Sequence, residues 1–246
     1  MTSSHGPKGP AGAASRVLLA EVASRARPVT MAGEHVLPVL VPLAPLFAEG
    51  GLRRGSTVVV RPGAGGGATS LALAVAVAAS QVGSWCAAVG WPALGMVAAA
   101  GLGMALERFA LVPYPGDQWP AVVTALVDAV DVVLLQPPRG VRSSDARRLT
   151  ARVRERGVVL VVNGSRWPEA ADHSLSVAPA GWRGLGQGHG YLQARSVEVT
   201  ATGRGAASRE RRVMLWLPGV HGTLGALEKA RVTLGHERPA PASAAG

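Results

Sequence analysis

The middle of the chain alternates between short apolar runs and longer segments with helical spacing. The apolar runs are four or five residues long and consist mostly of Val, Leu and Ala. Apolar strands that alternate with helices indicate a parallel sheet covered on both faces. We therefore expect strands at residues 57–60, 86–89, 109–112, 131–135 and 158–162, and helices at 69–81, 93–108, 119–129 and 144–156.

The pattern changes after about residue 172. Three further segments, 174–178, 191–200 and 212–217, alternate between apolar and polar residues and are separated by Gly-rich turns. Alternation with a period of two is typical of strands that bury one face. The whole pattern predicts an α/β fold, in which helices flank a mostly parallel central sheet that carries a short antiparallel C-terminal extension.

The ends of the chain have a different composition from the middle. Residues 1–14 and 235–246 are rich in Gly, Pro, Ala and Ser and predict disordered tails. A helix at 15–26 stops before Pro28, because a residue that precedes proline avoids the helical region. A Pro-rich connector follows up to residue 49, then a core over 50–172 and a β-rich C-terminal extension over 173–234.

Length and composition narrow the class of protein. A chain of 246 residues that is 48% hydrophobic suits one domain with short tails and excludes global disorder. Its longest apolar runs are diluted by Gly and Ala and fall below the roughly 18 residues that a membrane span needs. The first residues contain no apolar signal segment. We expect a cytoplasmic protein without a membrane segment.

Cysteine and histidine usage argues against metal chemistry. Cys86 is the only cysteine, which excludes a disulfide framework and a cysteine-based zinc site. The six histidines are scattered, without the spacing of metal ligands. No metal site is therefore predicted, and we expect Cys86 to be a buried, unreactive thiol in its apolar strand.

The chain carries a formal charge of +10, from 25 basic and 15 acidic residues. Only Lys8 and Lys229 among the basic residues are lysines, and a GC-rich genome explains this preference for arginine. It does not explain the surplus of positive charge. That surplus favours an acidic partner, with nucleic acid as the first candidate.

A Gly-rich segment after the first core strand has the frame of a phosphate-binding loop. In such loops the backbone N–H groups and a helix N-terminus surround phosphate groups, and the motif is G-x-x-x-x-G-K-[ST]. Here Pro62 stands at the first glycine and Ala68 at the lysine. The candidate nucleotide-binding residues are Gly63, Gly65, Gly66, Gly67, Thr69 and Ser70.

The resemblance to a known family extends beyond this loop. Residues 50–71, with Gly-Gly-Leu-Arg-Arg-Gly before the strand and Thr-Ser-Leu at the start of the helix, resemble the core of the RecA recombinase without a gap. Residues 86–89, 129–135 and 158–163 are similar to the later strands of that core. The resemblance covers about 50–165 and implies a RecA-like P-loop core.

This resemblance also implies that the catalytic groups are lost. Ala68 replaces the lysine that neutralises phosphate charge, and Gln136 replaces the aspartate that holds magnesium. The glutamate that orients the attacking water falls near Pro92. Phosphoryl transfer depends on placed charge. We therefore expect neither a resident cofactor nor ATP hydrolysis, and leave ATP binding without hydrolysis open.

A RecA-like core with a degraded ATP site resembles ImuA-type proteins, specifically the actinobacterial ImuA-prime group. The resemblance implies a non-catalytic, DNA damage-induced accessory factor of translesion synthesis. Its implied partners are an ImuB-like homologue of the Y-family polymerases and an error-prone C-family DNA polymerase. Two alternatives stay open, namely a RecA-type DNA-dependent ATPase or recombinase and a RecA-like cell-division inhibitor.

Arginine-rich segments are the candidate contacts with DNA or a partner. The densest lies at 139–156, where a serine at 143 or 144 is expected to cap a helix. The alternative is an ordinary solvated helix face and soluble loops. The candidates are Arg139, Arg142, Arg147, Arg148 and Arg152, then Arg183 in a Gly-rich segment, and Arg209, Arg211 and Arg212 near a turn.

Overall fold

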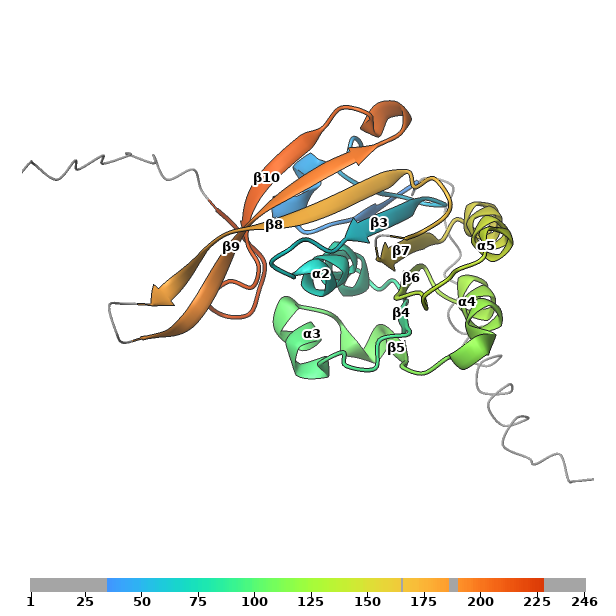
Figure 1. The fold of residues 1–246 in the computed structure, drawn as a ribbon, viewed down its shortest axis with the longest axis horizontal. Coiled ribbons are helices and arrows are strands. Elements are labelled where there is room, and N and C mark those ends of the chain that lie inside the picture. Colours follow the sequence, from blue (N-terminus) through green and yellow to red (C-terminus); the bar gives the residue numbers. More distant parts are fainter. Residues whose placement is uncertain (1–34, 165, 186–189, 228–246) are drawn as a thin grey trace, which may run out of the picture.

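The fold is built on one mixed sheet of nine strands, as seen in a computed structural model that describes residues 35–164, 166–185 and 190–227. The strand order is β11-β10-β9-β8-β3-β7-β6-β4-β5. Helices flank this sheet, so the predicted α/β class is confirmed (Figure 1). In the described ranges, no helix is both long enough and apolar enough to cross a membrane.

The central strands are parallel and buried, as predicted. Each contains four or five residues, and four of them have no exposed residue at all. Parallel strands with both faces covered read as continuous apolar runs, which is why the sequence pattern located them. They are β3 (Thr57–Arg61), β4 (Cys86–Val89), β5 (Phe109–Val112), β6 (Val132–Leu135) and β7 (Val159–Asn163).

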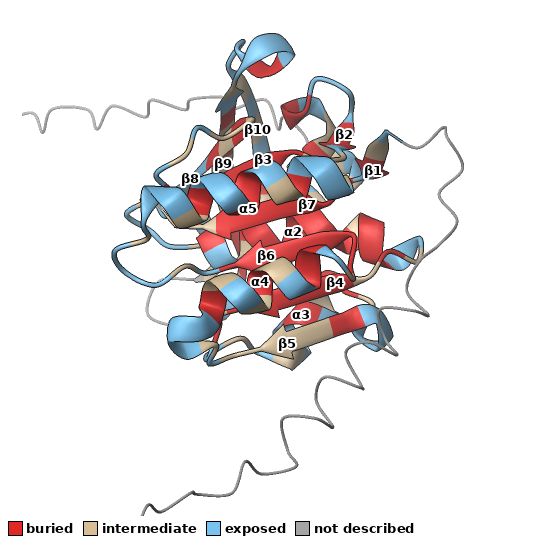
Figure 2. Cartoon of the chain, turned by 90° about the vertical axis from the view of Figure 1, so that its right-hand side faces the viewer, coloured by how far each residue is buried: buried red, intermediate tan, exposed pale blue. Residues whose placement is uncertain are grey.

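Two hydrophobic clusters lie on opposite faces of the sheet. The long helix α2 (Ala68–Gln81) and the shorter α3 (Met96–Leu102) contribute to one cluster together with Val58 and Val60. The helices α4 (Trp119–Val127) and α5 (Ser143–Arg156) contribute to the other together with Val59. Successive strand residues thus serve opposite cores, and Figure 2 shows α4 and α5 side by side on one face.

The helix predicted at 93–108 is shorter and interrupted. α3 ends at Leu102 because Gly103 adopts a left-handed conformation with φ of 102°, and a separate 3-10 turn covers Leu106–Arg108. A glycine with positive φ just after the last turn is a common helix stop. The continuous helical prediction was therefore wrong at this point.

The antiparallel part of the sheet is larger than predicted. β8 (His173–Leu185) pairs in parallel with β3 over its first four residues and antiparallel with β9 (Gly190–Gly203) from its first residue onward, and β9 pairs with β10 (Arg211–Trp216). β8 and β9 have 13 and 14 residues, so the expectation of a short extension was wrong. Their pairing tolerates Pro179 through a register shift. The end of this hairpin projects beyond the helices (Figure 1). We call its paired residues, 182–185 of β8 and 190–195 of β9, the arm.

The connector before β3 is compact. β1 (Val36–Pro38) pairs with β2 (Gly51–Arg53), and a 3-10 helix at Val41–Leu46 lies between them. Leu43 and Leu46 of this 3-10 helix are fully buried, so the Pro-rich connector packs against the core. The helix predicted at 15–26 and the tails predicted at 1–14 and 235–246 lie outside the described residues.

Candidate functional site

The Gly-rich loop joins β3 to α2 at the carboxyl edge of the parallel strands, where open α/β sheets bind ligands. Gly66 and Gly67 have φ values of 72° and 95°, which side chains disfavour. Gly67 is the N-cap of α2 and no side chain caps this helix. The first N–H groups of α2 are therefore available to an anion.

The loop is packed tightly against the start of the antiparallel part. A Cβ atom on Gly63 would overlap the backbone carbonyl of Val177 in β8, and one on Gly65 would lie 2.7 Å from the ring of Pro179. Gly63 is therefore needed for close approach of two backbones, and Gly65 for close approach of the Pro179 ring, apart from any ligand. The Gly-rich composition therefore has a structural reason of its own.

A buried arginine that the sequence analysis missed lies against this loop. Arg195 of β9 is only 6% exposed, and its Nη2 donates a hydrogen bond of 3.1 Å to the carbonyl of Gly66. Its guanidinium lies 5.6 Å from the ring centre of Trp182. Its Nε has no hydrogen-bond partner, and no carboxylate forms an ion pair with it among the described residues.

Arg195 thus places a positive charge beside a loop in which Ala68 replaces the lysine of the phosphate-binding motif. A buried guanidinium without a carboxylate is costly, and the N-terminus of a helix does not attract cations. The three positive features together, Arg195, the loop N–H groups and the start of α2, suit an anion. No local signal in the sequence identifies Arg195, because a single arginine in a predicted strand is ordinary.

Two of the three positions of the lost catalytic groups line one cavity, and the third does not. Ala68 is the buried first residue of α2, whereas Gln136 follows β6 and Pro92 follows β4. Gln136 and Pro92 line the same cavity, which does not include the loop glycines. The hydroxyl of Thr69 accepts a hydrogen bond of 3.3 Å from Asn163 at the end of β7, although in a working loop that hydroxyl would hold magnesium.

The cavity beside Gln136 is large and rich in proline. It measures about 950 Å³ and is formed by the loops that follow β4, β5 and β6. Trp119 in its wall is buried, while Tyr114 at its border is 79% exposed. The charges on its lining balance, since Arg139 and Arg142 face Asp117 and Asp145. The lining combines apolar surface with mixed charge, which suits contact with another molecule.

Most arginines of α5 are engaged by neighbouring carboxylates. This pairing reduces the free positive charge that the sequence predicted for the segment, although surface ion pairs contribute little stability. The pairs are Arg147 with Glu169 (3.6 Å), Arg148 with Asp145 (3.7 Å), Arg152 with Asp128 and Glu155 (2.9 Å each), Arg154 with Asp172 (3.8 Å) and Arg156 with Asp128 (2.9 Å).

The start of α5 differs from the prediction. The N-cap is Arg142, without a side-chain hydrogen bond, so neither serine at 143 or 144 caps the helix. Asp145 does lie in the first turn, where its charge suits the helix dipole. Among the described residues, Arg139 and Arg142 form no ion pair and remain available to an acidic partner.

The arm carries the next group of candidates. Arg183 lies on β8 beside Trp182, so this part of the predicted Gly-rich segment is strand rather than loop. Trp182, Tyr191 and Leu192 of the arm are 53%, 73% and 51% exposed. A group of exposed apolar side chains on a projecting hairpin is typical of an interaction surface.

The remaining arginine candidates lie at the opposite end of the antiparallel strands. Arg211 pairs in register with Ala201 on β9, and Arg212 forms ion pairs with Glu210 and Glu198. Arg209 lies in the turn before β10. These three arginines are not brought together with the Gly-rich loop.

Metal ligands are not gathered in the described part of the chain, where no group of three or more His, Cys, Asp or Glu side chains is placed to hold an ion. The Cys86 thiol is buried, as predicted, and burial together with the nearby charge of Asp131 raises its pKa to about 12. A thiol with so high a pKa is unreactive near neutral pH.

Two comparisons place the chain among known proteins. Residues 45–169, which hold the Gly-rich loop and all five central parallel strands, match the family model described as MT3502 N-terminal domain. An uncharacterized protein of Mycobacterium tuberculosis, Rv3395c, is 36% identical over 102 residues, which are 41% of this chain and 50% of that protein. The chain thus spans about half the length of this relative, whose mycobacterial source fits an actinobacterial family.

Proposed function

We propose that this chain, which belongs to the MT3502 N-terminal domain family, is a non-catalytic accessory protein with a RecA-like core. It would act in DNA damage-induced translesion synthesis in the cytoplasm. Its partners there would be an ImuB-like homologue of the Y-family polymerases and an error-prone C-family polymerase, with DNA as a further ligand. Neither comparison names such a role.

The observation that carries the proposal is the phosphate-loop frame without its charged groups. Ala68 starts α2, Gln136 follows β6, and the Thr69 hydroxyl accepts a hydrogen bond from Asn163 instead of standing free for a metal. A frame that retains its shape while these groups are replaced favours a role in binding over a role in phosphoryl transfer.

The strand arrangement supports the RecA-like core. The segments that resemble RecA form β3, β4, β6 and β7, and these four strands lie next to one another in the parallel part of the sheet. The loop follows β3, and Gln136 follows β6. Only β7 lies between these two strands in the sheet.

The arm supports a bridging role. Trp182, Tyr191 and Leu192 expose large apolar surfaces on one projecting hairpin, and Arg183 adds a positive charge. Aromatic and arginine side chains are the residues that most often dominate binding energy at protein interfaces. We propose that the arm contacts one of the polymerase partners.

Co-purification tests this proposal. A tagged full-length chain is co-expressed with the ImuB-like protein and the C-family polymerase, and retained partners are quantified. We expect retention by the wild type and about a tenfold loss for a Trp182→Ala, Tyr191→Ser, Leu192→Ser variant. Val220→Ser is the matched control, because that residue is a comparably exposed apolar side chain in a turn outside the arm. Retention of neither partner by the wild type contradicts the proposal.

ATP turnover separates the proposal from its enzymatic alternative. We expect no turnover above the buffer rate, with or without single-stranded DNA. Turnover at the level of a recombinase run in parallel would favour a RecA-type ATPase. Cell filamentation on overexpression, without polymerase association, would favour a division inhibitor.

A further inference from the structure

A second cavity, of about 530 Å³, lies at the edge of the sheet opposite the Gly-rich loop. It opens at the amino end of β3, whereas the loop follows the carboxyl end of that strand. The five residues of β3 therefore separate the two places by about 13 Å. The lining of this amino-edge cavity comes from residues 48, 49, 51 and 53–56, from Arg154, and from 172–173 and 204–207.

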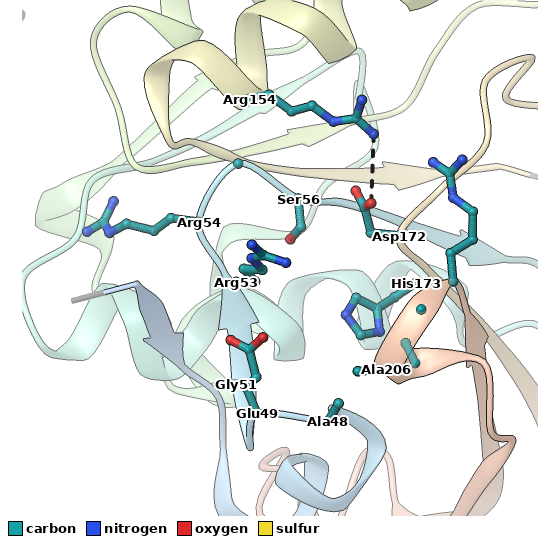
Figure 3. A pocket seen from close by; sticks show the side chains of 14 residues that line it. Ala48, Glu49, Gly51, Arg53, Arg54, Ser56, Arg154, Asp172, His173 and Ala206 are labelled. Atoms are coloured by element: carbon teal, nitrogen blue, oxygen red, sulfur yellow. Dashed lines mark ion pairs between the residues drawn. The ribbon is translucent and has the colours of Figure 1, made fainter. Parts of the chain in front are cut away.

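The amino-edge cavity gathers buried polar groups that lack partners. Ser56 is 4% and His173 is 8% exposed, and neither the Ser56 Oγ nor the His173 Nδ1 has a hydrogen-bond partner among the described residues. The same holds for Nε of Arg54. Buried polar atoms are nearly always hydrogen-bonded. Figure 3 shows the Ser56 hydroxyl and the His173 ring directed into the cavity.

The carboxylate of Asp172 is already engaged by the protein. Its Oδ2 accepts a hydrogen bond of 2.8 Å from the backbone N–H of Thr57, and its Oδ1 lies 3.8 Å from Nη2 of Arg154. This second distance exceeds that of a direct hydrogen bond, so Arg154 retains donors for another acceptor. Glu49 is the other acidic residue of the lining.

The cations of the lining are less fully engaged. Arg204 donates through Nη2 to the carbonyl of Ala170 at 2.7 Å, which leaves its charge without an acidic partner among the described residues. Arg53 likewise has no ion pair there. Arg54 is different, because it is paired with Asp131 outside the cavity at 2.9 Å. Among the described residues, Arg53 and Arg204 therefore line the cavity without an ion-pair partner, and Arg154 is held only loosely by Asp172.

We propose that the amino-edge cavity binds the phosphate group of a small phosphorylated molecule. A phosphate monoester presents several oxygens to one place, so it can accept hydrogen bonds from Arg53, Arg154 and Ser56 together. Burial lowers the pKa of His173, so its ring is neutral near pH 7 and offers one donor and one acceptor to the rest of the ligand. The cavity volume lies within the range of small-molecule sites.

The depth of the Ser56 hydroxyl favours a small ligand over a nucleic-acid strand. The Ser56 Oγ has almost no surface open to water, so only a small group that enters the cavity and displaces its lining can reach it. A terminal phosphate has one substituent and can enter end-on. A phosphodiester within a strand has two substituents, and surface phosphate contacts of that kind do not require a buried hydroxyl.

Isothermal titration calorimetry tests the proposal with three ligands. They are ribose 5-phosphate, inorganic phosphate and a single-stranded oligonucleotide without terminal phosphates. We expect ribose 5-phosphate and phosphate to bind the full chain, and Ser56→Ala and Arg53→Ala each to weaken binding about tenfold. The Ser56 hydroxyl has no partner in the described structure, so Ser56→Ala leaves the thermal midpoint unchanged and its loss of binding is not loss of fold.

Two matched controls locate the binding. Arg209→Ala and Arg108→Ala each remove an exposed arginine outside the cavity, and both should bind ribose 5-phosphate as the wild type does. The proposal is overturned if neither phosphate compound binds, if Ser56→Ala and Arg53→Ala bind normally, or if binding is abolished by Arg195→Met, which alters the Gly-rich loop instead. Binding of the oligonucleotide only would also overturn it, in favour of a strand contact.

Discussion

Replacement of Arg195 by methionine tests whether the charge beside the Gly-rich loop is a structural clamp or a ligand-binding group. Methionine retains the unbranched apolar stem of the side chain but is shorter than arginine and removes the guanidinium. In the folded chain this group is 6% exposed, donates one hydrogen bond to the Gly66 carbonyl and lies over the half-exposed Trp182 ring. The substitution therefore removes two favourable contacts and one large desolvation cost.

The magnitudes favour stabilisation. Burial of an ion without an oppositely charged partner costs several kcal/mol. The hydrogen bond from a charged donor returns about 1.5–2 kcal/mol and the contact with Trp182 about 1 kcal/mol. The Gly66 carbonyl belongs to an exposed residue, so water can replace the lost donor. We expect Arg195→Met to raise the free energy of unfolding by about 1–2 kcal/mol, or the midpoint by roughly 2–6 °C.

Thermal unfolding followed by circular dichroism, in a buffer without phosphate or sulfate, measures this change. Arg183→Met is the matched control, because Arg183 is an exposed arginine next to Trp182, and we expect it to change stability by less than about 0.5 kcal/mol. Destabilisation of Arg195→Met by about 2 kcal/mol or more would refute the reasoning and identify Arg195 as a clamp of the loop.

A second measurement on the same variant tests the ligand. Pyrophosphate binds anion sites made of backbone N–H groups and a guanidinium. If the Gly-rich loop and Arg195 form such a site, pyrophosphate raises the unfolding midpoint of the wild type by more than that of Arg195→Met. An equal rise in both proteins would show that Arg195 does not contribute to anion binding.

Three further predictions follow from single residues. Gly63→Ala should destabilise the fold by about 2 kcal/mol or more in urea unfolding, because the added Cβ would overlap the Val177 carbonyl. The control Gly101→Ala in α3 should stabilise the fold slightly. Equal effects of the two substitutions would contradict the close packing of the loop. Burial lowers the pKa of His173 from 6.5, so the folded state binds the proton less readily than the unfolded state. Stability is therefore constant above about pH 6.5 and falls as the pH drops below it, and His173→Gln should flatten that fall; an unchanged pH profile would contradict the assignment. The Cys86 thiol, with a pKa of about 12, should react with a thiol reagent at pH 8 only after unfolding, and rapid reaction of the native chain would show that the strand is exposed.

The sequence by itself determined the parallel core and the place of the loop. Strands such as 132–135 and 159–163 are buried on both faces, so their residues are apolar throughout, and the run of apolar residues is visible without any tertiary contact. The Gly-rich turn between β3 and α2 was equally visible, because its conformation needs glycine at consecutive positions such as Gly66 and Gly67.

The limits of local pattern explain the errors. The helix at 93–108 was extended through Gly103, although a left-handed glycine ends it at Leu102. The strands after residue 172 were too short in the prediction, because Pro179 and Gly181 read as breaks while the paired strand carries the backbone across a register shift. Pairing with a neighbouring strand supplies hydrogen bonds that no local composition reveals.

Only the tertiary structure decided which charges meet which groups. Arg195 contacts Gly66 across 129 positions of the chain, and four of the five arginines of α5 pair with carboxylates outside that helix. The amino-edge cavity likewise joins Ser56 to His173, which lie far apart in the sequence. Hydrophobic periodicity reports whether a residue faces the core, but Coulomb attraction and burial depend on distances that only the folded chain sets. For this reason the fold was readable in the sequence, while the charges of both candidate sites were not.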